Sequence, residues 1–354
     1  MDYKLLYALK SGKNIKLVYY IKNMLGMLIP NVFFQMQLHH KLASLSDRKD
    51  KDYILYRVNY YNKLLPGAIL PESVPALAEH KLKGHKVYIY DTRCYTRWFS
   101  QQLRLNLCAG DVDFVPPIPS ISKSRLITEN NGNGVIMKLN KIRHFIFVRD
   151  KKKFTEKKDM AVFRGKVTDK EQRIKFMKMY FGHPMCDLGD ISRDTINPTW
   201  CIGKLTIKEQ LEYKFVLAIE GYDVASNLKW VMSSNSIAVM PRPTCETWFM
   251  EGTLIPNYHY FEIKPDFSDL EERLQYYMAH TDEAQAIIEH AHEYIEQFKN
   301  KKREQLISLL VLEKYFKMTG QFNQRYINTY YTITSHPIQP RRTTLRTLCL
   351  KYPF

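Results

Sequence analysis

A buried strand that breaks at a glycine is the feature that most constrains the fold of this chain. Residues 216–219 form a continuous apolar run, which is typical of a strand covered on both faces. Gly221 permits a tight turn after this run, and a helix is predicted at 225–233. The free N–H groups and positive dipole end of such a helix are suited to a diphosphate. The pattern therefore predicts a strand-turn-helix unit and, with it, a phosphate site.

The second half of the chain alternates between strand and helix patterns. Strands are predicted at 160–164, 215–220, 236–240 and 258–263. Helices are predicted at 169–180, 225–233, 246–251, 267–280, 282–298 and 302–318, the last of which could return toward the first domain. This alternation is typical of an α/β domain with a parallel, Rossmann-like sheet.

The first half carries weaker signals. Strands are predicted at 86–91, ending at Asp91, and at 141–148. The charged run 149–158 has no strand or helix pattern, so we interpret it as a solvated linker and expect a domain boundary near residue 155. The expected domains are an acceptor-side domain with a basic amphipathic opening, a nucleotide-sugar donor domain and a basic tail, at residues 1–155, 156–320 and 321–354.

The charge of the chain limits its partners. The formal net charge of +17 favours nucleic acid, an anionic membrane surface or a phosphorylated substrate. The six cysteines include no Cys-x-x-Cys pair, so neither a zinc site nor a disulfide framework is indicated, and we expect reduced thiols in the cytoplasm. The tail has basic residues and no acidic residue after Glu313, which suits either a surface anchor or a solubilising role.

The amino-terminal segment is apolar but interrupted. Residues 17–34 include Lys22, Gly26 and Pro30, so the segment is a poor membrane span and has no secretory signature. Its lysines alternate with apolar residues, which suits a helix lying on anionic lipid. An ordinary first helix packed on a sheet is the alternative.

Several segments together resemble glycosyltransferase family 90. Ala161-Val-Phe-Arg-Gly165 is similar to the Phe-Arg-Gly motif of the family, and Arg173 stands where a second arginine follows it. The likeness runs from about Lys86 to Phe298 and is strongest between Phe163 and Ile263. The family includes protein O-glucosyltransferases, fungal capsule-associated proteins and bacterial enzymes of lipopolysaccharide core assembly.

The resemblance implies a GT-B-like fold, in which two Rossmann-like domains face a cleft. It also implies an inverting transfer, without a metal ion, from a UDP-sugar to a lipopolysaccharide or related glycan. We expect an enzyme with such an acceptor to be cytoplasmic, and it could lie peripherally on the anionic inner membrane surface. The implied donor-binding residues are Arg164, Gly165, Arg173, Gly221, Ser226, Asn227, Lys229 and Glu246.

These assignments have structural alternatives. Arg164 could bind phosphate with two N–H groups or form a salt bridge, and Ser226 could donate to phosphate or cap a helix. Asn227 or Lys229 stands where eukaryotic relatives carry an arginine. Glu246, with Glu220 as a second candidate, could hold sugar hydroxyls or occupy the first turn of a short helix.

Asp91 is the expected catalytic base. It ends a predicted strand in the acceptor half and resembles the position of the family's catalytic aspartate. A carboxylate there can take the proton of the attacking hydroxyl. Asp111 and Asp113 are alternatives, and helix capping is the competing role of Asp91. The Asp111-Val-Asp113 pair lies far in sequence from the donor candidates, so we do not expect it to hold a metal ion.

Two other classes of function remain open. A basic nucleic-acid-binding protein would show clustered cations and aromatic residues and salt-sensitive binding, but we find no known binding motif and expect no nucleic acid. A membrane-associated scaffold on a transferase fold would lack turnover.

Overall fold

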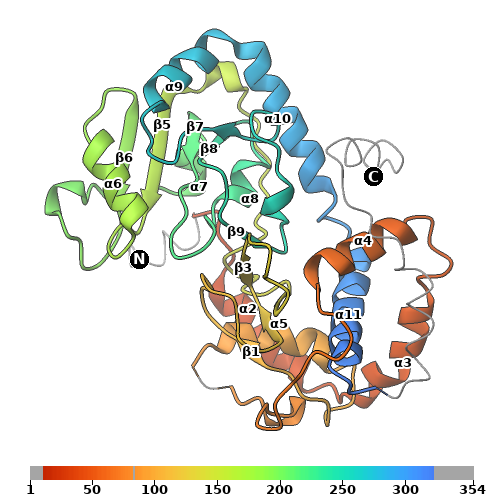
Figure 1. Ribbon diagram of the computed structural model, residues 1–354. Helices are drawn as coiled ribbons and strands as arrows, with labels where there is room; N and C mark the ends of the chain where they lie inside the picture. The colour runs from red at the N-terminus through yellow and green to blue at the C-terminus, as the bar shows by residue number, and fades with distance from the viewer. Residues whose placement is uncertain (1–10, 83, 323–354) are drawn as a thin grey trace. The chain divides into compact units, whose positions relative to one another are not determined.

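The computed structural model describes residues 11–82 and 84–322 (Figure 1). The chain forms two compact units. Of the described residues, 11–24 join Asn140–Glu296 in the first unit, and Leu25–Leu139 join 297–322 in the second. The domains expected at 1–155, 156–320 and 321–354 are functional assignments, and they stay predictions. The two compact units have different bounds from these domains.

The described part of the first unit contains a five-stranded parallel sheet, in the order β10-β8-β7-β5-β6. Its strands are β5 (Lys158–Gly165), β6 (Cys186–Asp190), β7 (Tyr213–Leu217), β8 (Ile237–Met240) and β10 (Phe261–Glu262). The expected α/β class with a parallel sheet is therefore confirmed. The sequence prediction missed β6, because its five residues, Cys-Asp-Leu-Gly-Asp, include two carboxylates and a glycine and form no apolar run.

Successive side chains of each strand point to opposite faces of this sheet, and one face forms the core. Phe163, Phe215, Leu217 and Val239 lie in this core together with side chains of three helices. Those helices are α6 (Glu171–Tyr180), α9 (Leu270–Ala279) and α10 (Thr281–Glu296), and α9 packs on β5 while α10 packs on β8 (Figure 1). The unit also contains β9 (Cys245–Thr247), α7 (Ile207–Gln210), α8 (Leu228–Val231), η2 (Phe154–Glu156), η3 (Pro198–Trp200) and η4 (Glu251–Thr253).

The second unit is mainly helical. Its small parallel sheet has the order β1-β2-β4, formed by β1 (Leu107–Cys108), β2 (Ser120–Ser122) and β4 (Gly134–Ile136). Its other elements are α3 (Val32–Ala43), α4 (Lys51–Tyr61), η1 (Leu77–Glu79), α5 (Lys86–Thr96), β3 (Ser124–Leu126) and α11 (Lys301–Met318). The chain passes from the first unit into the second within α2 (Lys16–Met27).

Helix α11 lies in the core of the second unit, against α4, α5 and α3 (Figure 1). A buried ion pair joins α4 to α11, with 2.5 Å between Nη1 of Arg57 and Oε1 of Glu304. Lys138 reaches the other oxygen of the same carboxylate at 3.1 Å. Burial lowers the pKa of Arg57, but the Glu304 carboxylate together with Tyr61 and Tyr53 outweighs burial and leaves the pKa raised. The last helix thus returns to the amino-terminal part of the chain, as its position in the sequence suggested.

Two strand predictions in the first half are wrong. Residues 86–91 belong to α5, a helix in which the Thr92 hydroxyl donates to the Tyr88 carbonyl. Asp91 therefore lies within a helix and not at the end of a strand. Residues 141–148 form no strand, because Asn140 and Phe145 adopt φ of 55° and 58°, which interrupts an extended conformation.

Two helix predictions in the second half also need correction. The helix expected at 225–233 is limited to α8, and the helix expected at 246–251 is replaced by β9 and η4. Met250, at φ 59°, breaks helical backbone there.

The charged run 149–158 is not a solvated linker. The Lys157 side chain is fully buried and donates to Asp150 at 2.7 Å, and Asp150 also accepts from the Asn235 backbone N–H. These contacts fix the run on the sheet.

Within the described residues, no single helix is long and apolar enough to cross a membrane, although α2 and α3 pass that test together as a pair bent by 96°.

Candidate donor site and cavity

The sheet of the first unit has a topological switch point between β5 and β7. The chain leaves β5 for β6 on one side, and β7 then pairs with β5 on the other side. In open α/β sheets, ligands bind outside the carboxyl ends of the strands at such a point. The residues at this place are 164–166 at the end of β5 and 218–221 after β7. They include three of the predicted donor residues: Arg164, Gly165 and Gly221.

Arg173 joins the two strand ends at the switch point. From α6, its Nη1 donates to the Lys166 carbonyl at 2.8 Å, beyond β5. Its Nη2 donates to the Ile219 carbonyl at 2.7 Å and its Nε to the Glu220 carbonyl at 3.0 Å, beyond β7. The planar guanidinium can serve several acceptors at once. Its positive charge is thereby held between the ends of β5 and β7.

The two glycines at these strand ends allow neighbouring side chains to lie close to the backbone. A Cβ at Gly165 would lie 2.4 Å from the Phe163 ring, and one at Gly221 would lie 3.4 Å from Nη2 of Arg173. The Arg173 guanidinium itself lies 5.6 Å from the centroid of the Phe163 ring. The structure thus brings Gly165, Arg173 and Gly221 together, as the donor prediction requires.

A cation and an exposed aromatic ring lie beside Gly221. Nζ of Lys170 is 3.9 Å from the centroid of the Tyr222 ring, and Cδ of Lys170 is 3.6 Å from the Cβ position of Gly221. The Tyr222 side chain is 48% exposed, which is unusual for a large ring next to a buried strand. An exposed ring of this kind suits stacking on a planar base. The sequence analysis identified neither residue. What marks Tyr222 is the exposure of its ring, which only the structure shows.

Arg164 forms a salt bridge on the sheet. Its Nη2 donates to Oδ1 of Asp187 on β6 at 2.6 Å, and its Nη1 donates to the carbonyls of Phe163 and Asp187. Burial raises the pKa of Asp187, but hydrogen bonds from Tyr213 and Arg164 outweigh this effect and lower it. Burial and the same carboxylate raise the pKa of Tyr213 to about 12. The salt-bridge role weighed for Arg164 is the one seen here.

The segment after Gly221 does not form the predicted helical phosphate site. Helix α8 has four residues and begins after Ser226, which is half-buried. The Asn227 side chain donates to the Leu217 carbonyl at 2.9 Å and so ties the loop to the end of β7. Lys229 is buried in an ion pair with Glu251.

Glu246 and Glu220 differ in their surroundings, and Glu220 binds a loop. Glu246 is buried in β9, and its neighbours Thr244 and Cys245 donate backbone N–H groups to Glu220. Burial raises the pKa of Glu220, and the hydrogen bonds from Thr244 oppose this shift only in part. Glu220 therefore holds the β8–β9 connection against the end of β7.

The sequence prediction missed Asp190 and Ser192 at the carboxyl end of β6. Oδ1 of Asp190 accepts from the Val167 backbone N–H at 3.1 Å and from the Ser192 hydroxyl at 2.6 Å. Oδ2 accepts from the Thr195 hydroxyl at 2.7 Å. Burial raises the pKa of Asp190, but these hydrogen bonds lower it further than burial raises it. The Asp-x-Ser spacing is typical of a turn in which the Asp side chain accepts hydrogen bonds from the residue two positions later, and it could have indicated these residues in the sequence.

The three candidate bases have different surroundings in the second unit. Asp91 is 1% exposed on α5. Asp111 is 2.6 Å from Nζ of Lys123, and Asp113 is exposed.

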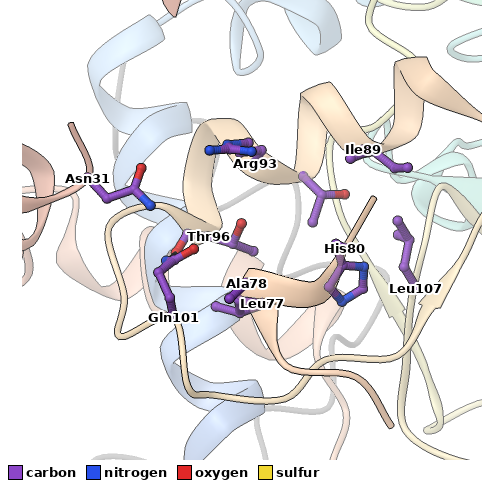
Figure 2. Close-up of a pocket in the computed structure, with 10 residues that line it drawn as sticks. Asn31, Leu77, Ala78, His80, Ile89, Arg93, Thr96, Gln101 and Leu107 are labelled. Atoms are coloured by element: carbon purple, nitrogen blue, oxygen red, sulfur yellow. Dashed lines mark hydrogen bonds between the residues drawn. The ribbon is translucent and has the colours of Figure 1, made fainter. Parts of the chain in front are cut away.

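A cavity of about 230 Å³ lies in the second unit (Figure 2). One face of α5 contributes Ile89, Thr92, Arg93 and Thr96, at the spacing of a helix face. Asp91 does not line this cavity. The other lining residues are Asn31, Leu77, Ala78, His80, Gln101 and Leu107. Figure 2 shows Asn31, Thr96 and Gln101 grouped at one end and His80, Ile89 and Leu107 at the other.

Two further observations concern metals and thiols. Residues 11–82 and 84–322 contain no group of three or more His, Cys, Asp or Glu side chains that could hold a metal ion. Cys94, Cys108, Cys186, Cys201 and Cys245 are free thiols.

Comparison with known proteins agrees with the family that the motifs resemble. Residues 135–342 match the family model described as glycosyl transferase family 90. The chain is also 38% identical over 262 residues to the O-glucosyltransferase LpsA of Dichelobacter nodosus, which covers 74% of this chain and 82% of that protein. The extent and level of both matches show that this chain belongs to glycosyltransferase family 90 and is a glycosyltransferase.

Proposed function

We propose that this glycosyltransferase takes its sugar from a UDP-sugar bound at the switch point between β5 and β7. The observation that carries the proposal is Arg173, whose guanidinium bridges the two strand ends beside Gly165 and Gly221. A fixed positive charge stabilises a departing diphosphate without reorganisation. Lys170 and the Ser226 hydroxyl supply further donors, and the exposed Tyr222 ring supplies a surface for the uracil base.

The proposed reaction inverts the anomeric carbon. The acceptor oxygen forms a bond to that carbon as the carbon–oxygen bond to UDP breaks, and Asp91 takes the proton of the acceptor hydroxyl. UDP leaves with the bonding electron pair. The proposal needs no metal ion, since cationic side chains stabilise the leaving group. It also includes a GT-B-like arrangement, in which the second unit provides the acceptor side.

The proposed acceptor is a hydroxyl of a lipopolysaccharide core or related lipid-linked glycan, and the proposed sugar is glucose. The relative from Dichelobacter nodosus is an O-glucosyltransferase, which supports glucose transfer to oxygen. The net charge of +17 supports an anionic acceptor at the cytoplasmic face of the inner membrane.

The test is thermal stabilisation by UDP, GDP and ADP in the presence of EDTA. A ligand at one hundred times its dissociation constant adds about 2.7 kcal/mol to the stability of the folded state. We expect a shift that is selective for UDP. Lys170→Ala is expected to weaken UDP binding about tenfold by removing a cation near the diphosphate. Lys208→Ala, an exposed lysine of α7, is the matched control.

Arg164→Ala is a poorer probe, because it leaves the half-buried Asp187 without its ion partner. No shift with any nucleotide, together with salt-sensitive RNA binding, would overturn the proposal and favour a nucleic-acid-binding function. The configuration of the product, read by NMR, tests inversion independently.

A further inference from the structure

Helix α2 carries an apolar stripe that faces solvent. Its members are spaced i, i+1, i+4, i+7 and i+8, which places them on one helix face. No residue of α2 is buried. The members of the stripe are 48–68% exposed, and they are Leu17, Val18, Ile21, Met24 and Leu25. The half-buried positions of the same helix include Tyr19, Tyr20 and Asn23. Soluble proteins usually turn the apolar stripe of a helix toward the core, whereas the apolar stripe of α2 faces solvent.

The exposed apolar surface continues beyond α2 within the second unit. We call residues 25–36 the apolar ridge, and its large side chains are 47–78% exposed: Leu25, Leu28, Ile29, Val32, Phe33 and Met36. No residue of α3 is buried within the described structure. Contiguous exposed apolar surface of this kind marks an interaction site.

The apolar ridge is anchored to the second unit. Arg97, at the end of α5, donates to the carbonyls of Gly26 and Ile29, and its guanidinium lies 3.9 Å from the centroid of the Phe34 ring. The Phe34 ring meets the Trp98 ring edge to face at 5.2 Å. The Gln35 side chain donates to the Phe99 carbonyl at 3.0 Å. The inner side of the ridge is therefore fixed, and this holds the apolar side chains outward.

The charge around the ridge selects its partner. The sequence has no acidic residue between Asp2 and Asp47, and the same stretch contains six lysines. A symmetric contact between two copies would bring these like charges together. A leaflet of anionic lipids offers both a hydrocarbon phase for the ridge and negative charge for the lysines. Each of α2 and α3 has 12 residues, about 18 Å of helix, which is too short to cross the hydrocarbon core.

A cavity with both polar and apolar lining residues lies next to the ridge. Asn31 belongs to residues 25–36 and also lines the cavity of Figure 2, together with Arg93 and Gln101. An apolar surface beside a cavity with polar side chains fits an amphiphile, whose tail stays in the leaflet while its head meets side chains that donate hydrogen bonds.

We propose that the apolar ridge docks this enzyme on an anionic lipid leaflet by interfacial insertion. This inference rests on the proposed lipid-linked acceptor and identifies the surface that brings the enzyme to it.

The experiment measures co-sedimentation of the full chain with phosphatidylcholine vesicles, with and without phosphatidylglycerol. The wild type is expected to bind the anionic vesicles. The double variant Leu28→Glu and Phe33→Glu is expected to lose at least about tenfold in partition coefficient, since two charges replace inserted apolar side chains. The matched control is Leu65→Glu with Ile69→Glu, at two other exposed apolar positions of the same unit, and should bind like the wild type. Lys16→Gln and Lys22→Gln should each cost about fivefold at low salt.

Three results would overturn the inference. The first is a wild type that binds neither kind of vesicle, and the second is equal binding by the ridge variant and its control. The third is a wild-type dimer in light scattering that the ridge variant converts to a monomer, because a second copy would then occupy the ridge. UDP stabilisation without vesicles should be equal in all variants. A chain that binds anionic vesicles through the ridge but binds no nucleotide would retain the docking surface and overturn the proposed function.

Discussion

Lys229 and Glu251 form an ion pair in which each side chain is 1% exposed. Glu251 also accepts from the Thr247 backbone N–H at 2.6 Å and from its hydroxyl. The sequence suggested that Lys229 contacts the donor phosphates, whereas the structure gives it a buried carboxylate partner. The role of Lys229 in donor binding stays a prediction. Stability measurements can distinguish this role from a purely structural one.

We expect Lys229→Met to lower the free energy of unfolding by about 3–5 kcal/mol, because it leaves the Glu251 carboxylate buried without its cation. Denaturation in urea measures this change, and Lys229→Met combined with Glu251→Gln should recover part of it. A small loss of stability with complete loss of UDP binding would instead assign Lys229 to the donor site.

Replacing Gly165 tests the close packing at the switch point. A Cβ at this position would lie 2.4 Å from the Phe163 ring, so Gly165→Ala requires that buried ring to move. We expect a loss of about 1–3 kcal/mol in unfolding free energy, the range for an overpacked core, and weaker UDP binding. Gly132→Ala is the control, since its Cβ would meet its nearest neighbour only at 3.8 Å. Equal stabilities of the two variants would show that the ring moves freely.

Asp190 makes stability depend on pH. Its folded-state pKa lies below the ordinary value of 3.8, so the carboxylate stabilises the fold above that value. This contribution is lost as the pH falls through the folded-state pKa. We therefore expect the wild type to lose more unfolding free energy than Asp190→Asn as the pH falls below about 4. Urea denaturation across this range measures the difference, and parallel curves for the two proteins would contradict it.

Asp91→Asn tests the proposed base. Loss of the carboxylate should lower kcat by about 10²–10⁴-fold, while the KM for the donor changes little. Asp113→Asn, at an exposed position, serves as the matched control. Full turnover by Asp91→Asn with loss in Asp113→Asn would move the role to Asp113.

The sequence predicted the donor-side sheet better than the acceptor-side helices. The apolar run 216–219 and the Phe-Arg-Gly motif correctly indicated β7 and β5, because buried parallel strands are continuous apolar runs, although β7 ends at Leu217. Residues 86–91 alternate Val, Tyr and Ile, which favours a strand, yet they lie in α5 because tertiary packing overrides this preference. Arg173 and Gly221 were predictable from the family motif. The contacts of Arg173 were not, because they depend on carbonyls 46 and 47 residues away in the chain.

The buried pair of Arg57 and Glu304 has a consequence for biosynthesis. The two residues are 247 positions apart, so the ribosome makes Arg57 long before its partner. At about 5–20 residues per second, this delay is on the order of tens of seconds. The nascent second unit must keep the Arg57 guanidinium hydrated until α11 emerges. The strands of the first unit, which lie before Gln297, have by then all been made, so the parallel sheet can form before α11 completes the helical unit.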